Sequence, residues 1–200
     1  AALRVTIARY YTPSGRLIQR PYEDGNDLAY YRELYNEDRE SKIDSLKQLR
    51  PKYKTKSGRT VYGGGGITPD IYIPYKSAIN VETAKIIRNP KRPVFNFAST
   101  HAPYFKNEFP SFNSFKKDWD VSNLMLEEFF TYLKSDSIKF QKDSVIMNDS
   151  DFLKNRIKSE LAGSIWGKNE NTNIRLLFDN QVNEALKHFN EADAFIKSTN

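Results

Sequence analysis

Residues 149–167 read DSDFLKNRIKSELAGSIWG. Within this stretch an apolar residue recurs every four positions, at Leu153, Ile157, Leu161 and Ile165. That spacing places side chains on one face of an α-helix. Asp149 or Ser150 is suited to cap the start of the helix, and Gly167 suits its end, where a left-handed backbone is common. The stretch therefore predicts an amphipathic helix with one face turned toward a core.

The clearest amphipathic stripe of the chain follows this helix. Its apolar residues are Ile174, Phe178, Val182, Leu186 and Phe189, with Phe195 and Ile196 near the end. The stripe keeps a helical period throughout, so we expect a single last helix.

Further helices are predicted upstream. Two polar residues stand where they can cap helices, Asn80 and Ser122. The first would begin a short helix at 81–88, and the second a helix with a well-defined apolar face. Residues 94–106 predict a helix interrupted near Pro103, because proline lacks the backbone N–H that a helix interior needs. Residues 107–120 are aromatic-rich and read as irregular.

The beginning of the chain has a different character. Residues 3–11 read LRVTIARYY, which is dense in β-branched and aromatic residues and favours a strand. Pro13 and Gly15 then form a turn, since proline presets φ and glycine accepts positive φ. An extended pattern resumes at Arg16. We therefore expect a β-hairpin over residues 3–20.

A second group of short extended runs lies further on. Residues 53–55 and 60–62 flank a tight KSGR connection and predict another hairpin. Four glycines at 63–66 follow, and the sequence then leads through Pro69 into an expected strand at 71–73. Prolines on both sides of that strand are typical of an edge strand.

These patterns predict an α+β chain that divides near residue 76. Residues 1–76 form a β-rich part that carries a polar insertion at 20–65, and residues 77–200 form a helical C-terminal part. Inside the insertion, the sequence from Asp27 to Pro51 fits either one exposed helix or two short helices that flank a loop.

Composition excludes several classes of function. The chain has no cysteine, so disulfides, thiol nucleophiles and cysteine-ligated metals are excluded. The net charge of +6 comes from 31 basic and 25 acidic residues that are interspersed, as on an ordinary solvated surface. No run approaches the roughly 18–20 apolar residues that span a bilayer. The chain also opens directly on a strand-like pattern, so we expect it to begin inside a larger protein.

No residue is assigned a catalytic, cofactor-binding or metal-ligating role. The glycines at 63–66 lack the following Lys-Ser or Lys-Thr of a phosphate loop. His101, in an expected Thr-His-Ala-Pro loop, and His188 lack the spacing of a metal site and are interpreted as structural. Ser14 and Ser57 sit in polar turns, where nothing would keep a neighbouring lysine neutral.

The aromatic residues of the region 104–119 interleave with lysines: Tyr104, Phe105, Phe109, Phe112, Phe115 and Trp119. A surface that binds single-stranded nucleic acid combines the same residue types. A helical core or a peptide-contact surface does so too, and we favour that interpretation over nucleic-acid binding.

Two motifs carry a resemblance to a known family. They are YYTPSGR at 10–16, within residues 3–19, and GITPDI at 66–71. Together they resemble one segment of the C-terminal processing peptidases, or tail-specific proteases. About forty-five residues separate them here, whereas the family usually joins them by a short link, so the role of the insertion is left open.

The resemblance implies a fold and an activity. The family's protease core is related to the crotonase and Clp-protease architecture, and a serine nucleophile and a lysine base lie upstream of the matching segment. The chain would then be the C-terminal fragment of a serine endopeptidase that cleaves proteins near their C-termini, itself inactive because it lacks both catalytic residues. The resemblance also implies protein or peptide substrates and a periplasmic or otherwise extracytoplasmic location.

Two further expectations concern partners. The alternative function is a non-catalytic helical module that binds a protein or peptide. Independently of function, strands without their sheet partners are expected to self-associate through unpaired edges.

Overall fold

The computed structural model consists of two compact units, and each is described by itself. The helical unit comprises residues 75–186, and the mixed unit comprises residues 1–74 together with 187–200. The structure describes residues 2, 3, 5, 7–20, 49–73 and 79–197. The helices expected between Asp27 and Pro51 lie almost wholly outside these residues.

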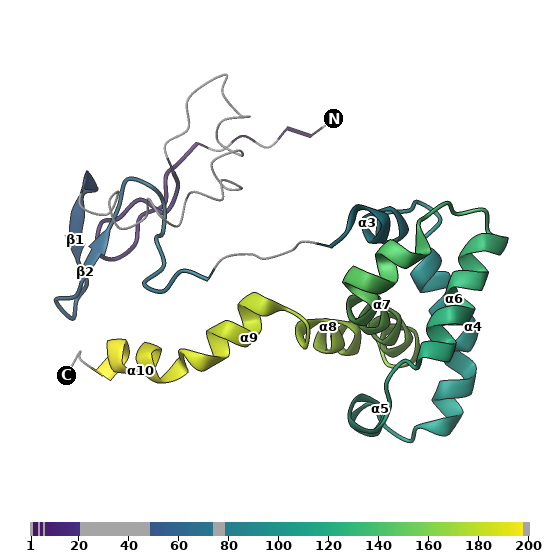
Figure 1. Cartoon of the computed structure of the whole chain (residues 1–200). Helices are drawn as coiled ribbons and strands as arrows, with labels where there is room; N and C mark the ends of the chain where they lie inside the picture. The colour runs from purple at the N-terminus through teal and green to yellow at the C-terminus, as the bar shows by residue number, and fades with distance from the viewer. Residues whose placement is uncertain (1, 4, 6, 21–48, 74–78, 198–200) are drawn as a thin grey trace. The chain divides into compact units, whose positions relative to one another are not determined.

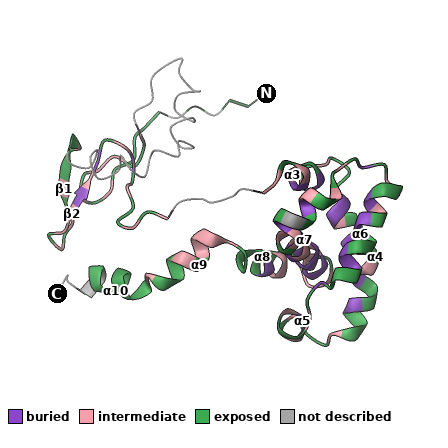
Figure 2. Ribbon diagram, viewed as in Figure 1, coloured by how far each residue is buried: buried purple, intermediate pink, exposed green. Residues whose placement is uncertain are grey.

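The helical unit is built around one long helix (Figure 1). Its elements in chain order are α3 (Val81–Ile87), α4 (Pro93–Glu108), α5 (Phe112–Asp118), α6 (Asn123–Ser135), α7 (Lys142–Ile165), α8 (Lys168–Leu176) and α9 (Asn180–Lys187). Helix α7 packs against α4 and α8, and α3 lies against both α7 and α4. In Figure 2 the buried residues of these helices face one another across this core.

The apolar stripe of α7 forms the centre of the core, as predicted. Leu153, Ile157 and Leu161 are fully buried, and Ile165 packs against the same cluster. Removal of about 25 cal/mol per Å² of apolar surface from water is the main force that holds α7 in place. Gly167 follows the helix with φ 122° and ψ −176°, a positive-φ conformation outside the left-handed helical region expected there.

The predicted caps at Asn80 and Ser122 are confirmed. Asn80 Oδ1 accepts a hydrogen bond from the Glu82 N–H at 2.8 Å, and Ser122 Oγ accepts one from the Met125 N–H at 3.1 Å. Each satisfies a backbone donor that the first turn of a helix leaves unpaired.

Two predictions for the helical unit are wrong, and a third coincides with a kink. Helix α4 runs without interruption through Pro103, because Phe97 and Phe105 are buried on either side of the proline and anchor the helix. The stretch expected to be irregular contains α5, whose start is stabilised by a capping box between Ser111 and Ser114. Helix α7 spans Lys142–Ile165 as two helical segments that meet at a kink at Asp149, with φ −136° and ψ 19°, so the start expected at Asp149 or Ser150 coincides with this kink.

The prediction of a single last helix is also wrong, because the helix is interrupted twice. The region forms three helices, α8, α9 and α10 (Phe189–Lys197), and α10 belongs to the mixed unit. Asp179 Oδ1 accepts the Val182 N–H at 3.0 Å, so this carboxylate starts a new helix where the apolar period continues. Most of the expected stripe is exposed, including Phe178 at 54% and Leu186 at 57%.

The predicted β-rich N-terminal part is contradicted. The described residues contain a single sheet of two antiparallel strands, β1 (Lys52–Lys54) and β2 (Thr60–Tyr62), and helices dominate the rest. This pair confirms the second predicted hairpin, with Tyr53 opposite Val61. The expected strand at 71–73 does not form. Of the first hairpin, the described residues form an isolated Tyr11–Leu17 bridge, with further hydrogen bonds from the Thr12 N–H to the Arg16 oxygen and from the Ile18 N–H to the Tyr10 oxygen.

The physical reason is the absence of partners. Leu3, Val5 and Ile7 are 89%, 66% and 93% exposed, and no described strand pairs with them. A strand needs neighbouring backbone N–H and C=O groups, and β-propensity describes only how well a residue fits an existing sheet. Val61 is the single buried hydrophobic side chain among the described residues of the mixed unit.

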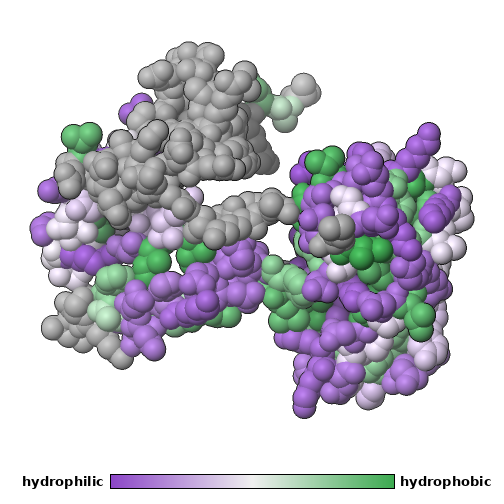
Figure 3. Space-filling model, viewed as in Figure 1, coloured by the Kyte–Doolittle hydropathy of each residue, from purple (hydrophilic) through white to green (hydrophobic). Residues whose placement is uncertain are grey.

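The surface agrees with the interspersed charge. On the face shown in Figure 3, hydrophilic and hydrophobic residues are intermixed over the helical unit. Within the described residues, none of the helices has both the length and the apolar character to cross a membrane.

Glu82 connects the start of α3 to the start of α7, and this contact predicts a pH dependence. Its carboxylate accepts hydrogen bonds from Lys85 Nζ at 2.6 Å and from the Gln141 N–H at 2.9 Å, which hold the pKa of Glu82 below its ordinary value of 4.5. A lowered folded-state pKa contributes stability that is complete above the unfolded-state pKa and is lost as pH falls through the folded-state value. From about pH 5 to about pH 3, we therefore expect the wild type to lose more stability than Glu82→Gln in urea denaturation. Equal losses would contradict this role of the carboxylate.

Candidate functional site

The first motif contacts the end of β2, and the second motif lies close to the residues that follow the first. Arg16 Nη1 donates to the Tyr62 carbonyl oxygen at 3.5 Å, which joins the first turn to the end of β2. The turn itself has the predicted geometry, with a 2.8 Å hydrogen bond from the Gly15 N–H to the Thr12 oxygen and φ 82° at Gly15. Although about forty-five residues separate the motifs in sequence, the fold makes them neighbours.

The glycines at 63–66 are required by close packing. A Cβ atom on Gly63 would lie 2.6 Å from the Tyr53 ring, and one on Gly65 would lie 2.6 Å from the Arg50 guanidinium carbon. Gly66 has φ 78°, and a Cβ there would lie 3.1 Å from the Ile18 oxygen. These contacts support the interpretation of the glycine stretch as tightly packed backbone, although only β2 flanks it as a strand.

Gly66→Ala is expected to loosen the contact between the motifs. Alanine at φ 78° costs about 1–2 kcal/mol of backbone strain, and its Cβ also crowds the Ile18 oxygen and the Arg20 side chain. Gly58→Ala is a matched control, because Gly58 has the same φ of 78° but nothing lies within 4 Å of its Cβ position. We expect trypsin to cleave after Arg16 and Arg20 several-fold faster in Gly66→Ala than in Gly58→Ala. Equal rates would show that the contact contributes nothing.

Lys158 of the helical unit is buried and is followed by a serine, but the two form no dyad. Lys158 Nζ donates to the Lys116 oxygen at 2.9 Å, to Asp120 Oδ1 at 2.8 Å, and to the Trp119 oxygen. These acceptors use all three hydrogens of the ammonium group, so it has no capacity to act as a neutral base. The Ser159 hydroxyl donates instead to the Arg156 oxygen at 2.8 Å.

Both histidines make local contacts. His101 lies within α4 and not in a loop, with Nδ1 2.8 Å from the Phe97 oxygen and Nε2 3.2 Å from Glu128 Oε1. His188 Nδ1 is 3.0 Å from Glu191 Oε1. Among the described residues, no group of three or more histidine, aspartate or glutamate side chains could hold a metal ion. Each histidine therefore has the surroundings of a structural residue.

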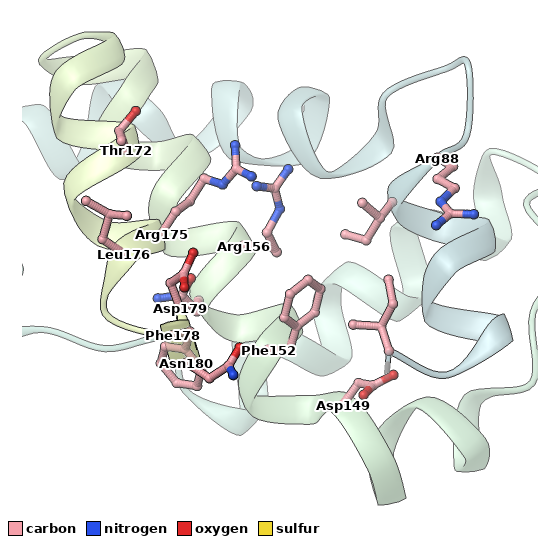
Figure 4. A pocket seen from close by; sticks show the side chains of 13 residues that line it. Arg88, Asp149, Phe152, Arg156, Thr172, Arg175, Leu176, Phe178, Asp179 and Asn180 are labelled. Carbon is pink, nitrogen blue, oxygen red and sulfur yellow. The ribbon is translucent and has the colours of Figure 1, made fainter. Parts of the chain in front are cut away.

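A cavity of the helical unit lies between α3, α7 and α8 and has a volume of about 620 Å³. We call it the basic pocket. Three arginines line it, Arg88 from the end of α3, Arg156 from α7 and Arg175 from α8. Figure 4 shows Arg156 and Arg175 side by side, with Arg88 at the other side of the pocket. Apolar side chains complete the wall: Ile79, Ile87, Phe152, Leu176 and Phe178.

The two carboxylates of the basic pocket are both engaged in backbone capping. Asp149 is 7% exposed, and its Oδ2 accepts the Asn80 N–H at 2.7 Å. Asp179 accepts the Val182 N–H. Asn155 is likewise used structurally, because its Nδ2 donates to the Ile174 oxygen at 2.9 Å and ties α7 to α8. The kink in α7 coincides with the contact that Asp149 makes with the start of α3.

Arg156 is electrostatically strained. Burial lowers the pKa of its guanidinium, and the charge of Arg175 lowers that pKa further, while Glu160 acts in the opposite direction. Its Nη2 lies 3.4 Å from Glu160 Oε1, and its Nε is buried without a hydrogen-bond partner. Burial of a polar group without a partner costs roughly 1–3 kcal/mol. This arginine is therefore held in a position that its own neighbours do not fully satisfy.

Sequence reasoning missed the basic pocket. Its arginines come from three helices, and no local motif marks residues that only tertiary packing brings together. The available signal was the spacing of Asp149, Phe152 and Arg156, and of Thr172 and Arg175, at three or four positions on single helix faces. That signal is weak, because solvated helix faces show it too.

Comparison with known proteins gives one match. The model of a family of unknown function (DUF8443) matches residues 91–167, which include α4 to α7 but neither peptidase-like motif. The match covers less than half of the 200-residue chain. No curated protein matches the chain. No solved structure matches it either.

Proposed function

We propose that the chain is the C-terminal part of a serine endopeptidase of the C-terminal processing type. The observation that carries the proposal is the pair of motifs, which are distant in sequence, with Gly66 of the second motif close to the Ile18 oxygen that follows the first motif. No serine and lysine form a dyad among the described residues, and the proposal places the reactive groups in polypeptide upstream of the chain.

The exposed strand-like residues support the same proposal. Leu3, Val5 and Ile7 alternate with polar residues in the sequence, and their side chains are exposed. A sheet contributed by an upstream protease core would cover them and pair their backbone groups. The extracytoplasmic location that the family resemblance implies is part of this proposal.

The test begins with the coding sequence upstream of residue 1. We expect it to encode a serine and a lysine that form a dyad, and replacement of that serine by alanine should abolish peptide hydrolysis by the whole gene product. The 200-residue chain alone should not hydrolyse peptides. Turnover that persists in the chain purified to homogeneity, or an upstream sequence without such a pair, would refute the proposal.

A second function is favoured by a separate observation, the basic pocket. Its size falls within the range of about 300–1,000 Å³ that is typical of ligand sites, and it combines apolar walls with a few charged groups. We propose that the helical unit binds peptide segments there. Selection of peptides from a displayed library by the intact chain should yield sequences whose binding is weakened by Phe152→Ala. Failure to select any sequence would count against peptide binding.

A further inference from the structure

The charged groups of the basic pocket leave a net positive charge. Three arginines and two aspartates line it, which gives 3 − 2 = +1. Both aspartates already accept backbone hydrogen bonds. In contrast, the side chains of Arg88 and Arg175 make no hydrogen bond or ion pair with other described residues. The pocket therefore offers donors that the protein leaves unused.

Arg156 and Arg175 are the strongest pair of these donors. They lie side by side on α7 and α8 (Figure 4), and neither forms an ion pair with Asp149 or Asp179 of the pocket. Glu160 contacts Arg156 alone and is not part of the pocket lining. Two like charges in a partly buried site favour an anion that neutralises both, because Coulomb interactions are stronger there than in water. The unpartnered Nε of Arg156 is one further donor in this region.

We infer that the basic pocket binds a carboxylate carried on an apolar group. The planar guanidinium of Arg175 or Arg156 matches a carboxylate with two parallel N–H···O bonds. The net charge of +1 favours a monoanion over a phosphate dianion, which would also face Asp149 and Asp179. Phe152 and Leu176 provide the apolar wall for the attached group.

The inference rests on the second function proposed above only where the carboxylate belongs to a peptide. Two sources share the required chemistry, a free organic acid and an acidic side chain between apolar residues. The probe for the first is 3-phenylpropionate, and the probe for the second is acetyl-Phe-Asp-Phe-amide. Each has a neutral counterpart of nearly the same shape, 3-phenylpropanamide and acetyl-Phe-Asn-Phe-amide. Inorganic phosphate tests whether charge alone suffices.

The experiment titrates the intact chain with each probe and follows amide chemical shifts by NMR. We expect at least one carboxylate probe to bind about tenfold or more tightly than its neutral counterpart and more tightly than phosphate, with shifts concentrated at residues 149–156 and 172–179. Equal binding of acid and amide, stronger binding of phosphate, or shifts confined to other regions would overturn the inference.

A charge-matched pair of variants locates the site. Arg175→Gln should lower the affinity for the carboxylate probe about tenfold. Lys134→Gln, on the exposed surface of α6, should leave that affinity unchanged. Because Arg175 is exposed and repels Arg156, its replacement should not lower the thermal unfolding temperature. Unchanged affinity in a folded Arg175→Gln protein would overturn the assignment. If Arg175→Gln does not fold, the affinity of the carboxylate probe for Arg88→Gln is measured instead. An affinity equal to that of the wild type would then overturn the assignment.

The outcomes also separate this inference from peptide binding in general. Binding of 3-phenylpropionate without binding of the tripeptide supports the carboxylate site and counts against a peptide ligand. Peptides selected without any acidic residue support peptide binding and count against the carboxylate site.

Discussion

Phe115→Ala is expected to destabilise the helical unit by about 3–5 kcal/mol. Phe115 is fully buried, and its ring lies 5.0 Å from Trp119, 5.1 Å from Trp166 and 5.5 Å from Phe109 between ring centroids. Truncation removes this apolar area and leaves a cavity that large rigid neighbours do not fill by small shifts. Since the free energy of unfolding of a whole domain is only about 5–15 kcal/mol, this single change removes a large part of the stability.

Urea denaturation followed by tryptophan emission measures this effect directly. Both tryptophans of the chain contact the Phe115 ring, so the emission signal comes from the packing in question. Tyr104→Ala is the control, because Tyr104 is 64% exposed on the neighbouring α4, and it should cost less than about 1 kcal/mol. A loss in Phe115→Ala no larger than in Tyr104→Ala would contradict the described core.

Lys158→Met is expected to cost about 3 kcal/mol, although methionine fills a similar volume. The side chain of Lys158 is 6% exposed, and its ammonium group satisfies two carbonyl oxygens at the end of α5, those of Lys116 and Trp119. Methionine cannot donate to them, so they are left without that partner in a partly buried site. Chemical denaturation compared with the wild type gives the measurement.

The acidic partner of Lys158 should contribute much less to the stability of the fold. The Asp120 side chain is 88% exposed, so water replaces the interaction when Asp120→Asn removes its charge, and the cost should stay below about 1 kcal/mol. This asymmetry distinguishes a lysine that caps backbone carbonyls from one that forms an ordinary ion pair. Equal losses in the two variants would show that the ion pair dominates.

Local signals account for the parts of the fold that sequence predicted correctly. The four-residue stripe at Leu153, Ile157 and Leu161 is a property of one helix face, and caps such as Ser122 act within one turn. The α8–α9 break had a local signal as well, the cap at Asp179. The apolar period through Phe178 and Val182 concealed it, because periodicity alone does not show where a helix stops.

In the mixed unit, local sequence signals did not suffice to predict the structure. Strand-like residues such as Val5 and Ile7 indicate that a segment suits a sheet. They do not determine whether a partner strand is present to pair with that segment. The basic pocket was unpredictable for a related reason. Arg88, Arg156 and Arg175 acquire a common role only after three helices pack, and each by itself resembles a solvated arginine.

The hydrogen bond from the Asn80 N–H to Asp149 has a consequence for the order of assembly. Its two residues are 69 positions apart, whereas α7 and α8 are joined through Gly167 and meet almost as soon as they form. Contacts between distant positions are delayed by the entropy of closing the intervening loop. We therefore expect α3 to dock last, so that the basic pocket matures only in the final stage of folding and is the first region to open when the unit fluctuates.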